Sequence, residues 1–169
     1  AARELTVDRN GQQWPASNIG IDFSEVDSVQ QITASANFLR TDDLVPLLRS
    51  VDLKQLKEFG LTGLPSGELR DVKFSISRTG EKILEYDLSG DFSALGYVSP
   101  DHGIDIMGFS GSVTADKTGG SLELDVRNAR FGLASVFRKV LPINRLSGVV
   151  VWRSSPDGYR VLANSLELE

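Results

Sequence analysis

The sequence predicts a mainly β protein whose strands form one strongly curved antiparallel meander sheet, a taco-like groove, with about three short helices. Three observations predict this architecture. Apolar and polar residues alternate along most of the 169 residues, and this period of two is typical of strands with one buried face. Turn sequences separate the alternating runs, at spacings that favour consecutive hairpins. The alternation also changes phase inside two runs, which predicts bulges that bend long strands.

The strands are predicted from runs with one apolar face and one charged or hydroxylated face. Residues 72–76, 84–92 and 122–126 show this alternation most clearly. The sequences "RTGE", "KTGG" and "SSPDGY" separate runs of this kind and predict tight hairpin turns. The phase slips at Met107-Gly108 and again near Asn128, so we expect a bulge at each position.

Three stretches break the alternation and predict short helices. "RTDDLVPLLRS" offers Thr41 or Asp42 as the N-terminal cap, and "VDLKQLKEFG" offers Asp52 as a cap and Gly60 as a stop. "FGLASVFRKVLP" ends at Pro142. We expect these helices to act as plugs or lids on the curved sheet.

Composition and charge exclude several classes of protein. The chain has no cysteine and one histidine, which excludes thiolate chemistry, Cys-ligated metals and His-rich metal sites. The net charge is -5, and Lys and Arg are scattered, so we expect no nucleic-acid partner. No apolar run approaches the roughly 18 to 20 residues of a membrane span, and no signal peptide is visible. The chain starts without Met and stops inside an alternating run, "NSLELE", so we interpret it as a fragment of a longer protein.

Two internal repetitions suggest a modular organisation. An apolar residue followed by Ser-Gly occurs at 88–90, 109–111 and 146–148, where we expect strands of a repeated hairpin array to begin. In addition, residues 10–22 match residues 157–169 without a gap, from a turn dipeptide to a final acidic residue.

The longer repetition predicts a module boundary. We interpret residues 1–23 as the end of one module and residues 24–169 as the next module of the same repeated β-groove domain.

No catalytic motif emerges from the sequence. "GFSGS" around Ser110 departs from the nucleophile elbow at its last position and lies within a strand pattern, so Ser110 is interpreted as a strand residue. His102 is flanked by Asp101 and Asp105, but "SPDHGID" is ordinary turn chemistry and lacks the further ligands of a tight metal site. We therefore predict a protein that is not an enzyme and that uses no metal or cofactor.

The continuous apolar face is the informative feature, because a sheet with one apolar side must cover it. One alternative is a closed β-sandwich, which would serve as a structural or interaction module. The other is a curved sheet whose concave face stays open as a groove. A strand of seven residues spans about 23 Å, which is comparable to a lipid acyl chain.

The sequence also resembles a known family. The runs that carry the resemblance are "ITASANFLRTDDLVPLL", "LPSGELRDVKFSIS", "YDLSGDFSALGYVS", "GFSGSVTADKTGGSLELDVRNARFGLASVF" and "LSGVVVWRSSPDGYRVLANSLELE". They cover nearly the whole chain and resemble the YhdP family of AsmA-like proteins.

The resemblance implies a long protein of the Gram-negative envelope. Its anchor would be an N-terminal inner-membrane helix outside this fragment, and its periplasmic part would be a repeated, bridge-like β-groove. Such a groove would carry phospholipid between the inner and outer membranes without catalysis. The implied partners are phospholipid acyl chains and the neighbouring β-groove modules of the parent chain.

The alternation and this implied function together give a set of candidate lipid-facing residues on the apolar face. They are Phe74, Ile76, Leu84, Tyr86, Leu88, Phe92, Phe109, Val113, Leu122, Leu124, Val126 and Trp152.

Overall fold

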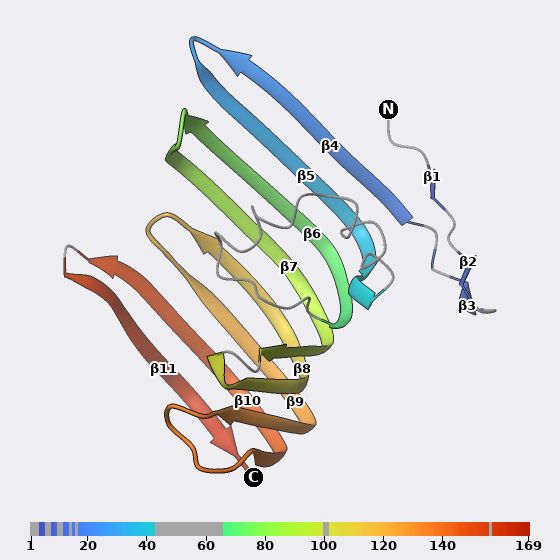
Figure 1. The fold of residues 1–169 in the computed structure, drawn as a ribbon, viewed down its shortest axis with the longest axis vertical. Helices are drawn as coiled ribbons and strands as arrows, with labels where there is room; N and C mark the ends of the chain where they lie inside the picture. Colours follow the sequence, from blue (N-terminus) through green and yellow to red (C-terminus); the bar gives the residue numbers. More distant parts are fainter. Residues whose placement is uncertain are drawn as a thin grey trace.

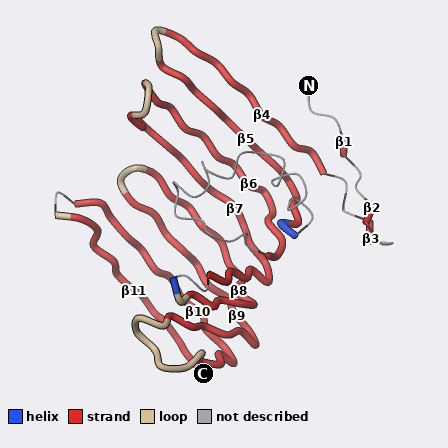
Figure 2. Tube along the Cα trace, viewed as in Figure 1, coloured by secondary structure: helices blue, strands red, loops and turns tan. Residues whose placement is uncertain are grey.

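A computed structural model describes residues 4–5, 8–9, 12–13, 15, 17–42, 66–99, 102–155 and 157–169, and almost all of these residues lie in β-strands (Figures 1 and 2). The strands are β1 (Glu4–Leu5), β2 (Asp8–Arg9), β3 (Gln12–Gln13), β4 (Ser17–Val26), β5 (Val29–Arg40), β6 (Ser66–Thr79), β7 (Lys82–Ser99), β8 (Ile104–Asp116), β9 (Gly119–Leu133), β10 (Leu141–Ser155) and β11 (Gly158–Leu168). One sheet contains nine strands in the order β1-β4-β5-β6-β7-β8-β9-β10-β11, and β2 pairs with β3 separately.

The predicted antiparallel meander is confirmed, because from β4 onward every strand pairs with the next strand in the chain. The sequences "RTGE", "KTGG" and "SSPDGY" form the tips of the β6–β7, β8–β9 and β10–β11 hairpins, as predicted. At the β4–β5 tip, Asp27 and Ser28 have φ values of 50° and 64°. Positive φ at both central residues matches the turn to the right-handed twist of the strands.

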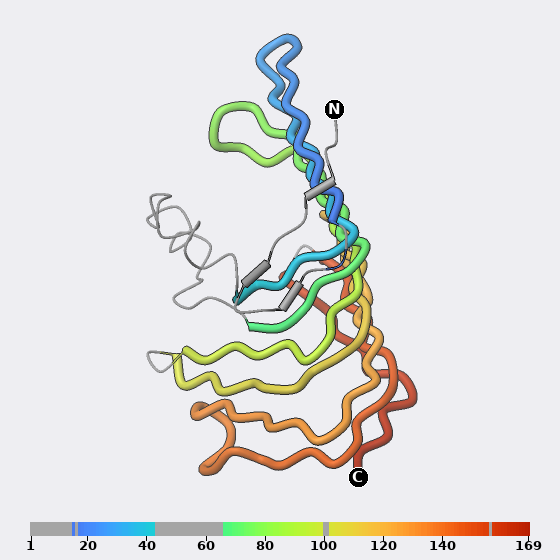
Figure 3. Tube along the Cα trace, turned by 90° about the vertical axis from the view of Figure 1, so that its right-hand side faces the viewer, coloured from blue at the N-terminus to red at the C-terminus, as the bar shows by residue number. Residues whose placement is uncertain are grey.

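The strands bend where backbone irregularities follow one another across the sheet. Asp71, Ala94, Gly108 and Asn128 have positive φ on β6, β7, β8 and β9, and register shifts accompany the first three. Seen from the side, the strands turn sharply partway along their length (Figure 3). The bulges predicted at Met107-Gly108 and near Asn128 lie on this line, which we call the crease. Extra residues on one strand of a pair bend that strand, and this accounts for the curvature.

The expectation of three short helices is not borne out. Thr41 and Asp42 are helical at the end of β5, but the rest of the first predicted helix, and all of the second, fall in residues 43–65, outside the described residues. The third prediction is wrong. Residues 131–133 continue β9, a turn follows, and β10 begins at Leu141.

Strand pairing explains why the third helix does not form. Phe131 pairs with Ile106 on one side and with Leu141 on the other, so its backbone belongs to the sheet. Only a single turn remains, closed by the Phe137 N–H donating to the Leu133 carbonyl at 2.7 Å. The apolar spacing of "FGLASVF" fits a helix, but here it places Phe131 and Phe137 in edge contact, with ring centroids 5.8 Å apart.

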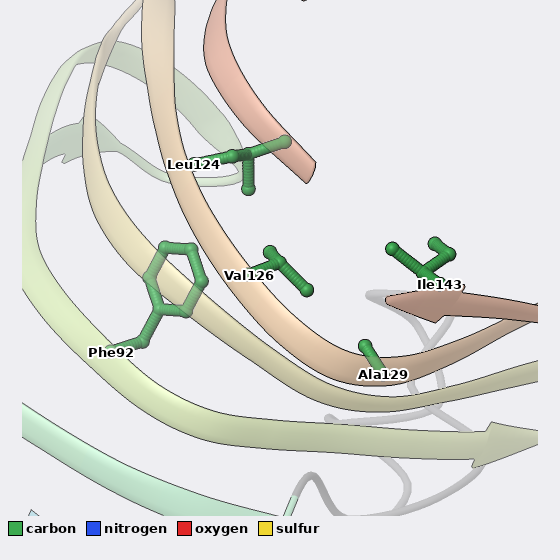
Figure 4. Close-up of a cluster of buried hydrophobic side chains, with 5 residues drawn as sticks. All are labelled: Phe92, Leu124, Val126, Ala129 and Ile143. Carbon is green, nitrogen blue, oxygen red and sulfur yellow. The ribbon is translucent and has the colours of Figure 1, made fainter. Parts of the chain in front are cut away.

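The hydrophobic core lies on the inner side of the crease. Its buried side chains come from β7, β9 and β10 and point toward one another (Figure 4): Phe92, Leu124, Val126, Ala129 and Ile143. We call these five residues the crease cluster. Partly buried apolar side chains pack around it: Leu69, Leu95, Phe109, Val113, Leu122, Phe131 and Leu146.

The sheet does not close on itself in the described part of the chain. Its first full-length strand, β4, and its last strand, β11, lie at opposite ends of the sheet order. The matching segments 10–22 and 157–169 fall partly on these two strands, which run in opposite directions (Figure 1). The module boundary after residue 23 stays a prediction.

Candidate functional site

A row of side chains crosses the sheet and defines its apolar face. Residues that lie directly opposite each other on paired strands point to the same side of a sheet. The register joins six residues from β5 to β10 in this way, and we call them the central row: Ala34, Phe74, Leu88, Ala115, Gly120 and Trp152. The side of the sheet that carries them is the groove face. Because the row is apolar from end to end, no charged side chain interrupts it.

All twelve predicted lipid-facing residues lie on the groove face. Phe74, Leu88 and Trp152 belong to the central row itself. The other nine are assigned to this face by their cross-strand pairs, by alternation along their own strands or by packing against the crease cluster. They are Ile76, Leu84, Tyr86, Phe92, Phe109, Val113, Leu122, Leu124 and Val126.

Burial separates these twelve residues into two groups. Phe92, Leu124 and Val126 are members of the crease cluster, and Val126 has no exposed surface at all. The remaining nine are at least partly exposed, and Phe74 has 36% of its surface accessible. The part of the groove face between the crease and the hairpin tips, which carries Phe74, Ile76, Tyr86, Leu88 and Trp152, is called the open arm below.

Several apolar residues of the same face were missed by the sequence prediction. Ile21 and Phe23 on β4 lie opposite Ala34 and Ile32 on β5, and they are 72% and 62% exposed. At the other end, Val161 on β11 lies opposite Trp152. The alternation in "NIGIDF" could have identified the β4 residues. The groove face therefore extends over both outer strands.

Two glycines let aromatic rings lie close to the sheet. A Cβ atom at Gly120 would run into the Trp152 indole, and a Cβ atom at Gly111 would lie 3.1 Å from Cζ of Phe92. Each glycine therefore leaves the space that a ring from the neighbouring strand fills. The ring replaces the contacts that a glycine cannot make and covers its backbone with apolar surface.

The opposite face of the sheet is polar and holds a hollow with a volume of about 1010 Å³. All six residues of the central row line this hollow, together with the polar residues that precede and follow them on their strands: Ser35, Lys73, Ser75, Asp87, Ser89, Thr114 and Asp116. On β4 the hollow is lined by Gly20 and Asp22 but not by Ile21, the apolar residue between them. Residues that precede and follow the central row point to the opposite side of the sheet, so we interpret this hollow as a trough on the polar face and distinguish it from the groove face.

Hydrogen bonds tie the polar face together. The Thr114 and Ser121 hydroxyls are 2.9 Å apart, and the Ser75 hydroxyl donates to Asp87 at 3.4 Å. Hydrogen bonds from the Thr118 hydroxyl and backbone N–H hold the pKa of Asp116 below its ordinary value. These contacts are typical of a solvated outer face.

A charged cluster fixes the ends of β5 and β6. Glu68 accepts hydrogen bonds from Arg40 at 3.0 Å and from Arg70 at 3.3 Å. The bond from Arg40 is the main cause that lowers the pKa of Glu68, against the opposing effect of burial. Both guanidinium groups also lie over the ring of Phe38, which is 2% exposed. The cluster covers an aromatic ring and has a structural role.

The residues considered for catalysis make ordinary structural contacts. The Ser110 hydroxyl accepts a hydrogen bond from the Ala94 N–H at 3.1 Å and so supports the β7 bulge. His102 Nδ1 lies 3.0 Å from the hydroxyl of Ser99, which is 1% exposed. Among the described residues, no group of three or more His, Cys, Asp or Glu side chains is placed to hold a metal ion. Within the same residues, no helix has the length and hydrophobicity needed to cross a membrane.

These features define a class of protein: an open antiparallel sheet, bent across its strands, with one continuous apolar face and one polar face. The family model described as "YhdP protein" matches residues 1–169, so this chain belongs to the YhdP family and the resemblance is confirmed. The family is one of bacterial envelope proteins, and membership points to a role related to lipid transport. No curated protein and no solved structure matches the chain.

Proposed function

We propose that this chain is a segment of a periplasmic hydrophobic groove that carries phospholipid between the inner and outer membranes, without a chemical step. The observation that carries the proposal is the groove face, which stays apolar from β4 to β11 in a sheet that, within the described residues, is not closed. Family membership supports the envelope location. The parent protein would be anchored in the inner membrane outside this chain.

The physical argument is that the groove face replaces water around the acyl chains. Removing apolar surface from water contributes about 0.8 kcal/mol per CH₂ group, so a lipid that leaves the membrane needs a continuous apolar surface. The central row provides several similar contacts in succession instead of one tight site. A lipid can therefore move from strand to strand while most of its apolar surface stays covered.

The outer strands support a groove that continues beyond this chain. On β11, Leu166 and Leu168 are 44% and 69% exposed, and the described part of the chain provides no strand on its outer side. Such an edge presents unpaired N–H and C=O groups that favour pairing with another strand. We propose neighbouring β-groove modules of the parent chain as these partners.

Two neighbouring residues on β7 give a matched test. Leu88 lies on the groove face, whereas Ser89 points to the polar face opposite Lys73. We expect Leu88→Asp to reduce the comigration of fluorescent phosphatidylethanolamine with the chain on size-exclusion chromatography. We expect Ser89→Asp to bind lipid like the wild type.

Wild-type chain that takes up no phospholipid would contradict the proposal. The chain would then be better explained as a structural or interaction module of the envelope. Equal loss of lipid in both variants would mean that the groove face is not the site.

A further inference from the structure

Resting on the proposed function, we propose that acyl chains contact only the open arm of the groove face, and that the crease cluster is a closed wall that lipid does not enter. The groove face, which is uniformly apolar in sequence, would then consist of a contact surface and a structural part. It assigns different roles to residues on the same strand, such as Leu88 and Phe92 on β7.

The crease cluster has very little accessible surface. Phe92, Leu124 and Val126 have exposed fractions of 9%, 7% and 0%. An acyl chain is wider than a water molecule, so it cannot touch Val126, and it meets too little surface at Phe92 and Leu124 to lie against them. Figure 4 shows the five side chains of the cluster directed into the same space inside the bend. Entry of an acyl chain would require these side chains to separate.

Residues around the cluster also keep the crease closed. Phe109 and Phe131 lie on adjoining strands with ring centroids 6.2 Å apart, and both pack against the cluster. The glycine at position 111 lets the Phe92 ring lie against the sheet. Packed side chains of this kind resist opening, because every separated pair of side chains loses its contacts.

The open arm has the accessibility and the dimensions that the crease lacks. Phe74 is 36% exposed, and Ile76, Tyr86 and Trp152 are partly exposed. On β6 the arm runs from Val72 to the hairpin tip, a length of about 23 Å for seven residues, comparable to an extended acyl chain. A lipid tail can therefore lie along the arm without reaching the closed part of the bend.

Photo-crosslinking of the unmodified chain tests this division. The probe is phosphatidylethanolamine with a diazirine in one acyl chain, and the adducts are mapped by peptide mass spectrometry. We expect adducts on residues 72–78, 84–90, 113–116 and 150–153, and none on Phe92 or residues 124–129. Adducts on the crease residues would overturn the inference. Absence of adducts anywhere would instead count against the proposed function.

A pair of truncations gives a second, independent readout. We expect Val126→Ala to lower the thermal midpoint and to bind phosphatidylethanolamine with unchanged affinity below that midpoint. We expect Leu88→Ala to weaken lipid binding several-fold with a smaller change in midpoint. If Val126→Ala weakened lipid binding as much as Leu88→Ala while the chain stayed folded, the crease would be part of the contact surface and the inference would be wrong.

Discussion

Aspartate substitutions at Phe74 and Leu124 should have different consequences, although both residues show the same alternation in sequence. Phe74 is 36% exposed on the open arm, whereas Leu124 is 7% exposed in the crease cluster. A new carboxylate at position 74 can reach water. One at position 124 would be buried without a partner, which is strongly unfavourable.

The expected magnitudes follow from burial. Truncating a buried leucine costs about 2–5 kcal/mol, and burying a charge adds to this, whereas a domain has only about 5–15 kcal/mol of stability in total. We therefore expect Leu124→Asp to be largely unfolded. Full burial of a large apolar side chain contributes about 1.5–3 kcal/mol, so losing the partly buried Phe74 should cost about 1–2 kcal/mol.

Circular dichroism during urea unfolding would measure the stability of both variants, and size-exclusion chromatography with fluorescent phosphatidylethanolamine would measure lipid binding. Phe74→Asp should stay folded and lose lipid. If Phe74→Asp unfolded as completely as Leu124→Asp, the open arm would be sealed in solution, and the reasoning would be refuted. If both variants stayed folded, the crease would be more accessible than its burial indicates.

Three further predictions concern the bend and the charged cluster. Gly111→Ala should lower the free energy of unfolding by about 1–3 kcal/mol, because the new methyl group meets the adjoining backbone and the Phe92 ring; denaturant titration would measure this, and an unchanged midpoint would contradict it. Ala94 has a φ of 50°, so Ala94→Gly should unfold at the same urea concentration or a higher one, whereas Ala94→Val should unfold earlier. The folded-state pKa of Glu68 is lowered from 4.5, so its contribution to stability is complete above that pH and is lost as the pH falls further. Glu68→Gln should therefore make the thermal midpoint less dependent on pH between about pH 3 and 6. An identical pH dependence in the wild type and the variant would contradict this role of Glu68.

The meander, its hairpin tips and the bulges could be predicted because their signals are local. "RTGE" and "KTGG" specify turns by their own chemistry, and the slip at Met107-Gly108 is visible as a change of phase. The helix expected in "FGLASVFRKVLP", residues 131–142, does not form, because its apolar spacing also suits a strand followed by one turn. The strand forms instead of the helix because Phe131 pairs with both β8 and β10, which are distant in sequence.

The division of the groove face could not be predicted from alternation. Phe74 and Phe92 both occupy apolar positions in clear strand patterns, yet one is exposed and the other is buried. The difference arises from the bend, which brings side chains of β7, β9 and β10 together on its inner side. The burial of each apolar residue therefore depends on where the crease crosses its strand and on which residues the neighbouring strands place beside it. The alternation within a single strand does not contain this information.

Native mass spectrometry with lipid extraction, on the chain purified without detergent from a bacterial host, tests the central claim most directly. The groove account predicts phospholipid bound at near-integral occupancy, and its loss in Leu88→Asp but not in Ser89→Asp. A lipid-free mass that also takes up no added phospholipid would contradict the account and leave the chain as a structural module of the envelope.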